Sequence, residues 1–170
     1  MWIGAIRLIA TTADAPDAGT DSLVQATVLR DGTALRVLNL DYPTEDDLER
    51  DAIRAYDYSG PTKLPRRNDQ TPELPTGIGQ IPMPYPGYGF EFSGGLNGHL
   101  KIQLRIRNDD MWIKDNVDLY VRYIRERATS FDTLAWVEDA EWSYVASWTQ
   151  DVAMSTDASE GVSTWTLGLN

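Results

Sequence analysis

The sequence predicts an all-β protein, an antiparallel β-sandwich of seven or more strands that forms one domain over residues 1–170. Three observations predict this class. Apolar and polar residues alternate with period two in several runs, these runs are rich in Trp, Tyr, Val and Thr, and no convincing long helix can be drawn. The 170 residues, 42% of them hydrophobic, are enough to bury one real core.

The clearest strand is expected at His99–Arg107, where Leu100, Ile102, Leu104 and Ile106 fall on one face and polar residues on the other. Asp31-Gly32 separates two β-rich runs and indicates a hairpin, because both residues tolerate the positive φ of a type I′ turn. The other expected strands are Trp2–Thr11, Leu23–Arg30, Thr33–Leu40, Arg54–Ser59, Asn116–Ile124, Trp142–Thr149 and Ser163–Leu169.

Three stretches interrupt this alternation. Thr44 precedes three acidic residues and could begin a short helix, and residues 124–142 contain helix formers without a clean apolar stripe. Residues 60–89 hold seven of the nine prolines. We expect this proline-rich insertion to be an elaborated loop inside the domain.

Composition excludes several classes of function. The 26 acidic and 15 basic residues give a net charge of -11, which argues against nucleic acid and admits an anionic membrane only if bound cations reverse the local charge. There is no Cys, and His99 is the single His, so thiolate and His-based zinc sites are excluded. His99 ends a turn and is expected at the surface.

Targeting signals are also missing from the sequence. The N-terminus lacks a basic n-region, and Arg7 breaks its apolar run. No segment approaches the roughly 18 apolar residues of a membrane span. We therefore expect a soluble chain without a signal peptide, cytoplasmic unless it is trimmed or exported by another route.

Two acidic stretches, DAPDAGTDS at Asp14–Ser22 and RNDDMW at Arg107–Trp112, carry the candidate site. Calcium prefers six to eight hard oxygen ligands, but Asp and Asn are also ordinary turn residues, and no EF-hand spacing is present. Whether both loops reach the same end of the sandwich depends on topology. The side chains that could supply ligands are Asp14, Asp17, Thr20, Asp21, Asn108, Asp109 and Asp110.

The same stretches carry a resemblance to a known family. IRLIATTADAPDAGTDSLVQATVL resembles the opening of a PLAT domain, a β-sandwich module that accompanies lipoxygenases and lipases, in which a strand ends in a Gly-Thr-Asp loop. LKIQLRIRNDDMWIKDNVDLYVRYI resembles the family's later signature, and DLERDAIRAYDYS is similar to its intervening segment around a Glu-Arg pair. The resemblance covers about half the chain. The proline-rich insertion and the residues after Arg125 depart from it.

The resemblance implies a function by binding. In such modules calcium, where it is bound, is held by acidic loop residues that include the Asp of the Gly-Thr-Asp turn, here Asp21. It therefore implies Asp21, Asn108 and Asp109 as the first calcium ligands. It also implies a non-catalytic module whose partner is a protein or a membrane surface. Behind the first three ligands stand Asp14, Asp17, Thr20 and Asp110.

Aromatic and acidic residues leave alternatives open. Trp112 could reach a bilayer or partner, although we expect it in the core. Trp142, Trp148 and Tyr144 share parity on one strand, so they could form a sugar-binding platform, but core packing is favoured. A carbohydrate-binding sandwich is thus one alternative function, and a structural subunit that pairs its strand edges with copies of itself is another.

An enzyme is not expected from this sequence. Glu138, Asp139 and Glu141 could be imagined as a glycosidase pair, but nothing in the sequence sets their separation. No converging nucleophile, acid and base can be assembled. The identity of the partner and the oligomeric state stay open.

Overall fold

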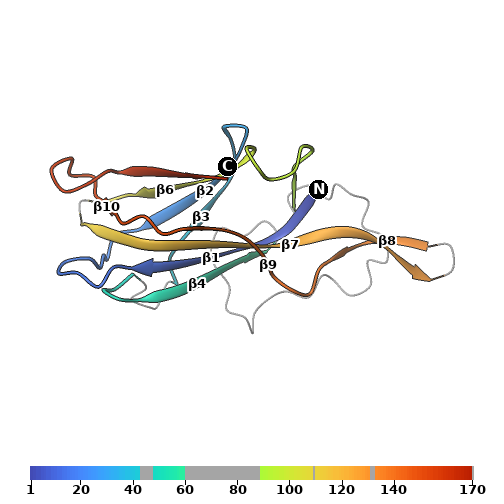
Figure 1. Cartoon of the computed structure of the whole chain (residues 1–170), viewed down its shortest axis with the longest axis horizontal. Coiled ribbons are helices and arrows are strands. Elements are labelled where there is room, and N and C mark those ends of the chain that lie inside the picture. Colours follow the sequence, from blue (N-terminus) through green and yellow to red (C-terminus); the bar gives the residue numbers. More distant parts are fainter. Residues whose placement is uncertain (43–47, 60–88, 109, 131–132, 170) are drawn as a thin grey trace.

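The computed structural model describes residues 1–42, 48–59, 89–108, 110–130 and 133–169, and within them the chain forms strands and no helix (Figure 1). No helix in this part of the chain is therefore long and apolar enough to cross a membrane. The strands are β1 (Trp2–Thr12), β2 (Val24–Arg30), β3 (Thr33–Asn39), β4 (Ile53–Ser59), β5 (Phe90–Glu91), β6 (Leu100–Ile106), β7 (Trp112–Ser130), β8 (Thr133–Glu138), β9 (Ser143–Trp148), β10 (Val152–Met154) and β11 (Thr164–Gly168).

The strands form two antiparallel sheets that pack as a sandwich, which confirms the predicted class (Figure 1). One sheet has the order β10-β7-β1-β4, with β5 paired to β1 and with β8 and β9 paired to β7. The other has the order β11-β6-β2-β3. The β1–β2 and β6–β7 connections therefore both cross from one sheet to the other. β7 begins beside the end of β1, and β2 begins beside the end of β6. Both crossings therefore lie at the same end of the sandwich.

The core lies between the sheets, where the alternating residues of each strand face inward. The predicted row on β6, from Leu100 to Ile106, is at most 1% exposed. It packs in one cluster with residues of β1 and β7 such as Leu8 and Leu119. Trp112 is fully buried, and its indole nitrogen donates to Thr12 Oγ1 at 3.0 Å. Its expected place in the core is confirmed.

The helical features of residues 124–142 do not produce a helix. β7 continues past Ile124 to Ser130 and pairs with β8 from Ile124↔Glu138 to Ser130↔Thr133, forming a hairpin arm that projects beyond the sandwich (Figure 1). A helix here would have no apolar stripe to bury, whereas the extended chain continues a ladder that the sheet has already started.

Short strands were missed for a different reason. β5 and β10 contain two and three residues, which is too few for an alternation to be read. Each is set by its neighbour, β1 for the first and β7 for the second. The possible helix at Thr44 and nearly all of the proline-rich insertion lie outside the described residues.

A buried cation lies near the start of β7. Lys114 is fully buried, and its ammonium group donates to the backbone carbonyls of Asp115, Trp148 and Gln150 at 3.2, 3.0 and 2.6 Å. Burial lowers the pKa of Lys114. Three carbonyl oxygens satisfy all three donors of the ammonium, so this side chain ties the loop between β9 and β10 to β7.

Candidate functional site at the acidic rim

The two acidic loops lie side by side at the end where both crossings occur. The Thr20 hydroxyl donates to Asp110 Oδ2 at 2.8 Å, and the Asp21 amide donates to the same oxygen at 2.9 Å. Thr20 Oγ1 also accepts from the Ser22 amide at 3.0 Å. One carboxylate oxygen of the second loop thus holds the corner of the first, although the loops are 89 residues apart in sequence.

The first loop is held in place by its backbone. The Thr20 amide donates to Leu48 O at 3.1 Å, and Ala18 accepts from the Ile113 amide at 2.9 Å. A Cβ at Gly19 would lie 2.9 Å from the Arg50 nitrogen. The glycine is therefore required by the close approach of the segment that precedes β4.

We call the resulting surface the acidic rim. It encloses an open cavity of about 260 Å³. Its lining contains four carboxylates and a single guanidinium, so the cavity attracts cations. The lining residues are Asp17, Ala18, Gly19, Thr20, Asp21, Glu49, Arg50 and Asp110.

The sequence-predicted ligands separate into groups. Four of the seven candidates meet at the rim: Asp17, Thr20, Asp21 and Asp110. Asp14 instead accepts from the Arg50 guanidinium at 2.6 Å. Asn108 is exposed and does not line the cavity, and Asp109 lies outside the described residues.

One acid of the rim was missing from the candidate ligands. Glu49 belongs to the segment around the Glu-Arg pair, and the alternation of that segment gives no reason to expect it beside the acidic loops. The Thr20↔Leu48 bridge is the contact that brings Glu49 there. Such a bridge depends on packing between distant segments, so local sequence carries little sign of it.

The fit of the rim to a cation is partial. Within the described part of the chain, no group of three or more Asp, Glu or His side chains is placed to hold a metal ion. Thr20 Oγ1 already donates to Asp110 and accepts from Ser22, so it serves the corner. Calcium would have to draw the carboxylates of Asp17, Asp21 and Asp110 closer together. Calcium binding stays a prediction.

The aromatic residues do not form the imagined platform. A register shift on β9 interrupts its pairing with β7 between Leu119↔Ala146 and Tyr120↔Tyr144. Tyr144 consequently is 59% exposed, whereas Trp148 packs against the core and its indole donates to Gly168 O at 3.0 Å. The favoured expectation of core packing is therefore confirmed for Trp148 and wrong for Tyr144.

Trp142 is in contact with two cations of its own chain. The Arg7 and Arg122 guanidinium carbons each lie 4.5 Å from the centre of the Trp142 ring. Arg7 is fixed in turn by two 2.6 Å hydrogen bonds to Asp57. The ring is thus occupied by cations of its own chain.

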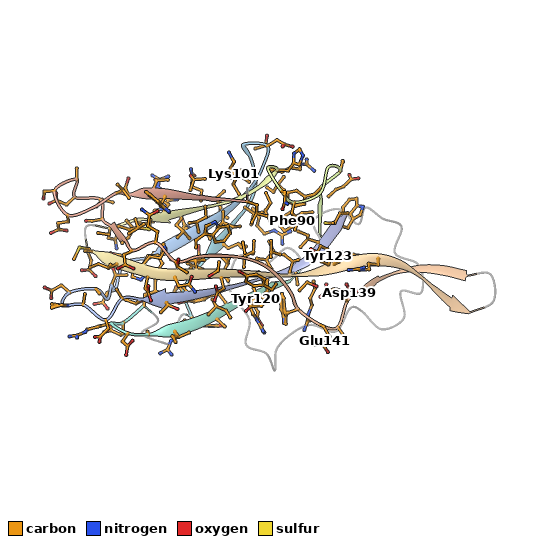
Figure 2. The ribbon with its side chains drawn as sticks, viewed as in Figure 1. Phe90, Lys101, Tyr120, Tyr123, Asp139 and Glu141 are labelled. Carbon is orange, nitrogen blue, oxygen red and sulfur yellow. The ribbon has the colours of Figure 1, made fainter. Side chains whose placement is uncertain are left out.

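The remaining side chains considered for catalysis are paired with other charged side chains. Glu138 pairs with Arg122 at 3.7 Å, and Asp139 pairs with Arg125 at 2.9 Å near the connection between β8 and β9 (Figure 2). His99 Nδ1 lies 2.5 Å from Asp31 Oδ1. The His99 side chain is 42% exposed, which confirms its expected position at the surface.

Comparisons with known proteins give matches to solved structures and no family. No protein-family model and no curated protein matches the sequence. Among solved structures, the alpha toxin from Clostridium absonum is 18% identical with a TM-score of 0.47, and the alignment covers 98% of this chain and 31% of the toxin. Coral 8R-lipoxygenase, described as activated by calcium through a C2-like domain, is 15% identical with a TM-score of 0.43, covering 85% of this chain and 16% of the enzyme.

A further neighbour is the lipoxygenase variant named Delta413-417:GS I805W LOX, with 13% identity and a TM-score of 0.46 over 98% of this chain and 16% of that one. The chain therefore spans about a third of the toxin and about a sixth of the lipoxygenases.

Proposed function

We propose that this chain is a non-catalytic, PLAT-like binding module that docks on a protein or membrane surface through the acidic rim, with calcium as its cofactor. The observation that carries the proposal is the tie between the loops, in which Asp110 accepts from both Thr20 and Asp21. It brings together the two stretches on which the family resemblance depends.

Charge gives calcium its role. Four carboxylates around one guanidinium repel one another, and a divalent cation with oxygen ligands offsets that repulsion. With a net charge of -11, the chain is repelled by an anionic surface until cations are bound. Calcium at the rim would therefore complete the docking surface as well as stabilise it.

Ion pairs support binding over catalysis. The acids that a glycosidase would use, Glu138 and Asp139, are held by Arg122 and Arg125. The one imidazole of the chain, on His99, precedes β6, at the end of the sandwich away from the rim. The rim carboxylates thus have no imidazole beside them.

Thermal melting with EDTA and with millimolar calcium tests the metal. A ligand at about 100 times its dissociation constant stabilises the folded state by about 2.7 kcal/mol, which corresponds to roughly 5–10 °C for a chain of this size. Asp21→Asn and Asp110→Asn should remove the shift, whereas Glu141→Gln, an exposed acid outside the rim (Figure 2), should keep it. Equal melting temperatures in EDTA and calcium would contradict a metal at the rim.

Vesicle sedimentation tests the surface. With vesicles of phosphatidylserine and phosphatidylcholine, we expect cosedimentation in calcium, none in EDTA, and a decrease as salt is raised. Asp110→Asn should lower the bound fraction, and Glu141→Gln should not. A melting shift without cosedimentation would indicate a protein as the partner.

A further inference from the structure

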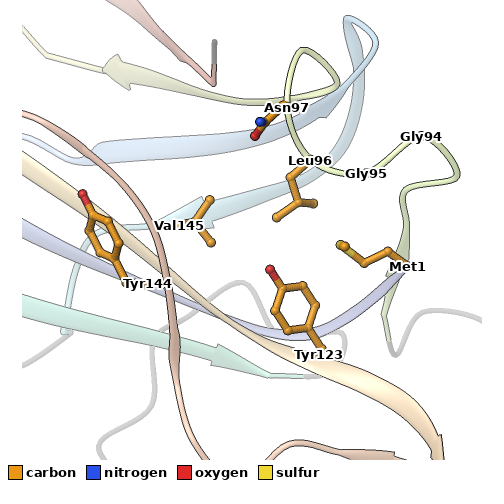
Figure 3. A pocket seen from close by; sticks show the side chains of 8 residues that line it. All are labelled: Met1, Gly94, Gly95, Leu96, Asn97, Tyr123, Tyr144 and Val145. Atoms are coloured by element: carbon orange, nitrogen blue, oxygen red, sulfur yellow. The ribbon is translucent and has the colours of Figure 1, made fainter.

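A second cavity lies at the other end of the sandwich, between the start of β1 and the middle of β7 (Figure 3). We call it the mouth pocket. Its volume is about 390 Å³, within the range of small-molecule sites. The residues that line it are Met1, Gly94, Gly95, Leu96, Asn97, Tyr123, Tyr144 and Val145.

The mouth pocket exists because the core ends unevenly. Val117, Leu119 and Val121 form a fully buried inward row on β7. Tyr123 is the next residue of that row, yet it is only half-buried and packs at the edge of the core. Its ring is therefore one wall of a hollow that no core side chain fills, and its hydroxyl is directed toward Leu96 (Figure 3).

The opposite wall is a loop held in one conformation. Leu96 is 8% exposed and anchors the loop in the core. Its carbonyl accepts from the His99 amide at 3.1 Å, and the Gly98 amide donates to Leu169 O at 3.0 Å. Asn97 lies between these two anchors. Its amide is thus presented from a fixed turn, which reduces the entropy lost on binding.

The lining is amphipathic, and its side chains are neutral. Two cations lie beside it: the N-terminal ammonium of Met1, and the Arg125 guanidinium, 5.2 Å from the centre of the Tyr123 ring. Burial raises the pKa of Tyr123, so the phenol stays protonated at neutral pH. No hydrogen bond joins the Tyr123 hydroxyl or the Asn97 amide to another described residue. Both groups can donate and accept, and they stand above apolar surface from Leu96 and Val145.

We propose that the mouth pocket binds a neutral sugar ring, such as the end of a glycan. A pyranose presents C–H faces that pack on apolar surface such as that of Leu96 and Val145, and neighbouring hydroxyls that suit one phenol and one carboxamide. The opening to solvent leaves room for the remainder of a longer chain.

Amide NMR titration tests the proposal with glucose, galactose, mannose and N-acetylglucosamine as probes. In EDTA, which keeps calcium out of the measurement, at least one sugar should shift the Gly94, Gly95 and Asn97 amide signals saturably, with a Kd of about 1–10 mM. Tyr123→Phe and Asn97→Ala should each weaken binding about 2–10-fold, the loss expected for one hydrogen bond.

Matched controls separate the pocket from general effects. Tyr42→Phe, whose hydroxyl donates to Ala55 O on β4, and Asn108→Ala, at the rim end, should leave the Kd unchanged. Retained signal dispersion in each variant shows that it folds. The proposal is overturned if no sugar gives saturable shifts, or if both pocket variants bind as the unmodified chain does. Neither result depends on whether calcium binds at the rim.

Discussion

The acidic rim and the mouth pocket are opposite ends of one sandwich, and they are built in opposite ways. At the rim, two connections cross between the sheets and are tied together by Asp110. At the mouth, the inward row of β7 outlasts the core, and Tyr123 is left half-covered. At the rim, the strand order brings two polar connections side by side. At the mouth, the core ends before the strand does, which leaves apolar surface beside the unpaired hydroxyl of Tyr123 and the amide of Asn97.

The largest effect is expected when the buried ammonium group of Lys114, near the rim, is removed. Lys114→Met should lower the free energy of unfolding by about 3 kcal/mol, because three buried carbonyls lose a charged donor. Urea unfolding measures the change. Lys101→Met, the same substitution at an exposed position of β6 (Figure 2), should stay within about 0.5 kcal/mol. Equal effects of the two substitutions would show that the carbonyl cage does not stabilise the fold.

A smaller effect is expected from cutting the tie itself. Thr20→Val keeps the shape of the side chain and removes the hydroxyl that serves Asp110 and Ser22. The loss should be about 1–2 kcal/mol, with faster hydrogen exchange at the Ser22 amide. Thr33→Val, at an exposed site on β3, is the matched control. Unchanged exchange at Ser22 would mean that the loops are held together by other contacts.

The smallest effect is expected at the mouth pocket, where the Tyr123 phenol should make the free energy of unfolding depend on pH in the alkaline range. The folded pKa of Tyr123 is raised by burial, above the unfolded value of about 10. Between these two values the unfolded chain releases the proton and the folded chain keeps it, so stability falls as pH rises. Urea unfolding across this range should show a shallower fall for Tyr123→Phe. Identical slopes for the two proteins would contradict a half-buried phenol.

Much of the fold could be predicted because burial on one side of a strand leaves a period of two. The His99–Arg107 run became β6 within one residue at each end. Period alone could not show the register shift on β9, which sends Tyr144 outward and Trp148 inward. Nor could it show that Ile124–Ser130 and Thr133–Glu138 pair as an arm, since their pairing continues a ladder that begins elsewhere.

The two sites differ in the same way: local sequence predicts some of their residues, and contacts between distant segments place the others. Asp17, Thr20, Asp21 and Asp110 were predicted from residue type and family resemblance, and the topology brings them together. Glu49 joins them through a bridge between distant segments. The mouth pocket could not be predicted, because it depends on where the core stops relative to β7, and no single segment records that.

Both ends are served by β7, which carries Lys114 near the rim and Tyr123 at the mouth, about 30 Å apart along the strand. Between these points β7 is hydrogen-bonded to β1 on one edge and to β9 on the other. A slip of one residue would turn every inward side chain of β7 to the other face, so its register is fixed by burial. We therefore expect the binding free energies at the acidic rim and at the mouth pocket to be additive, so that a ligand at one end leaves the affinity of the other end unchanged.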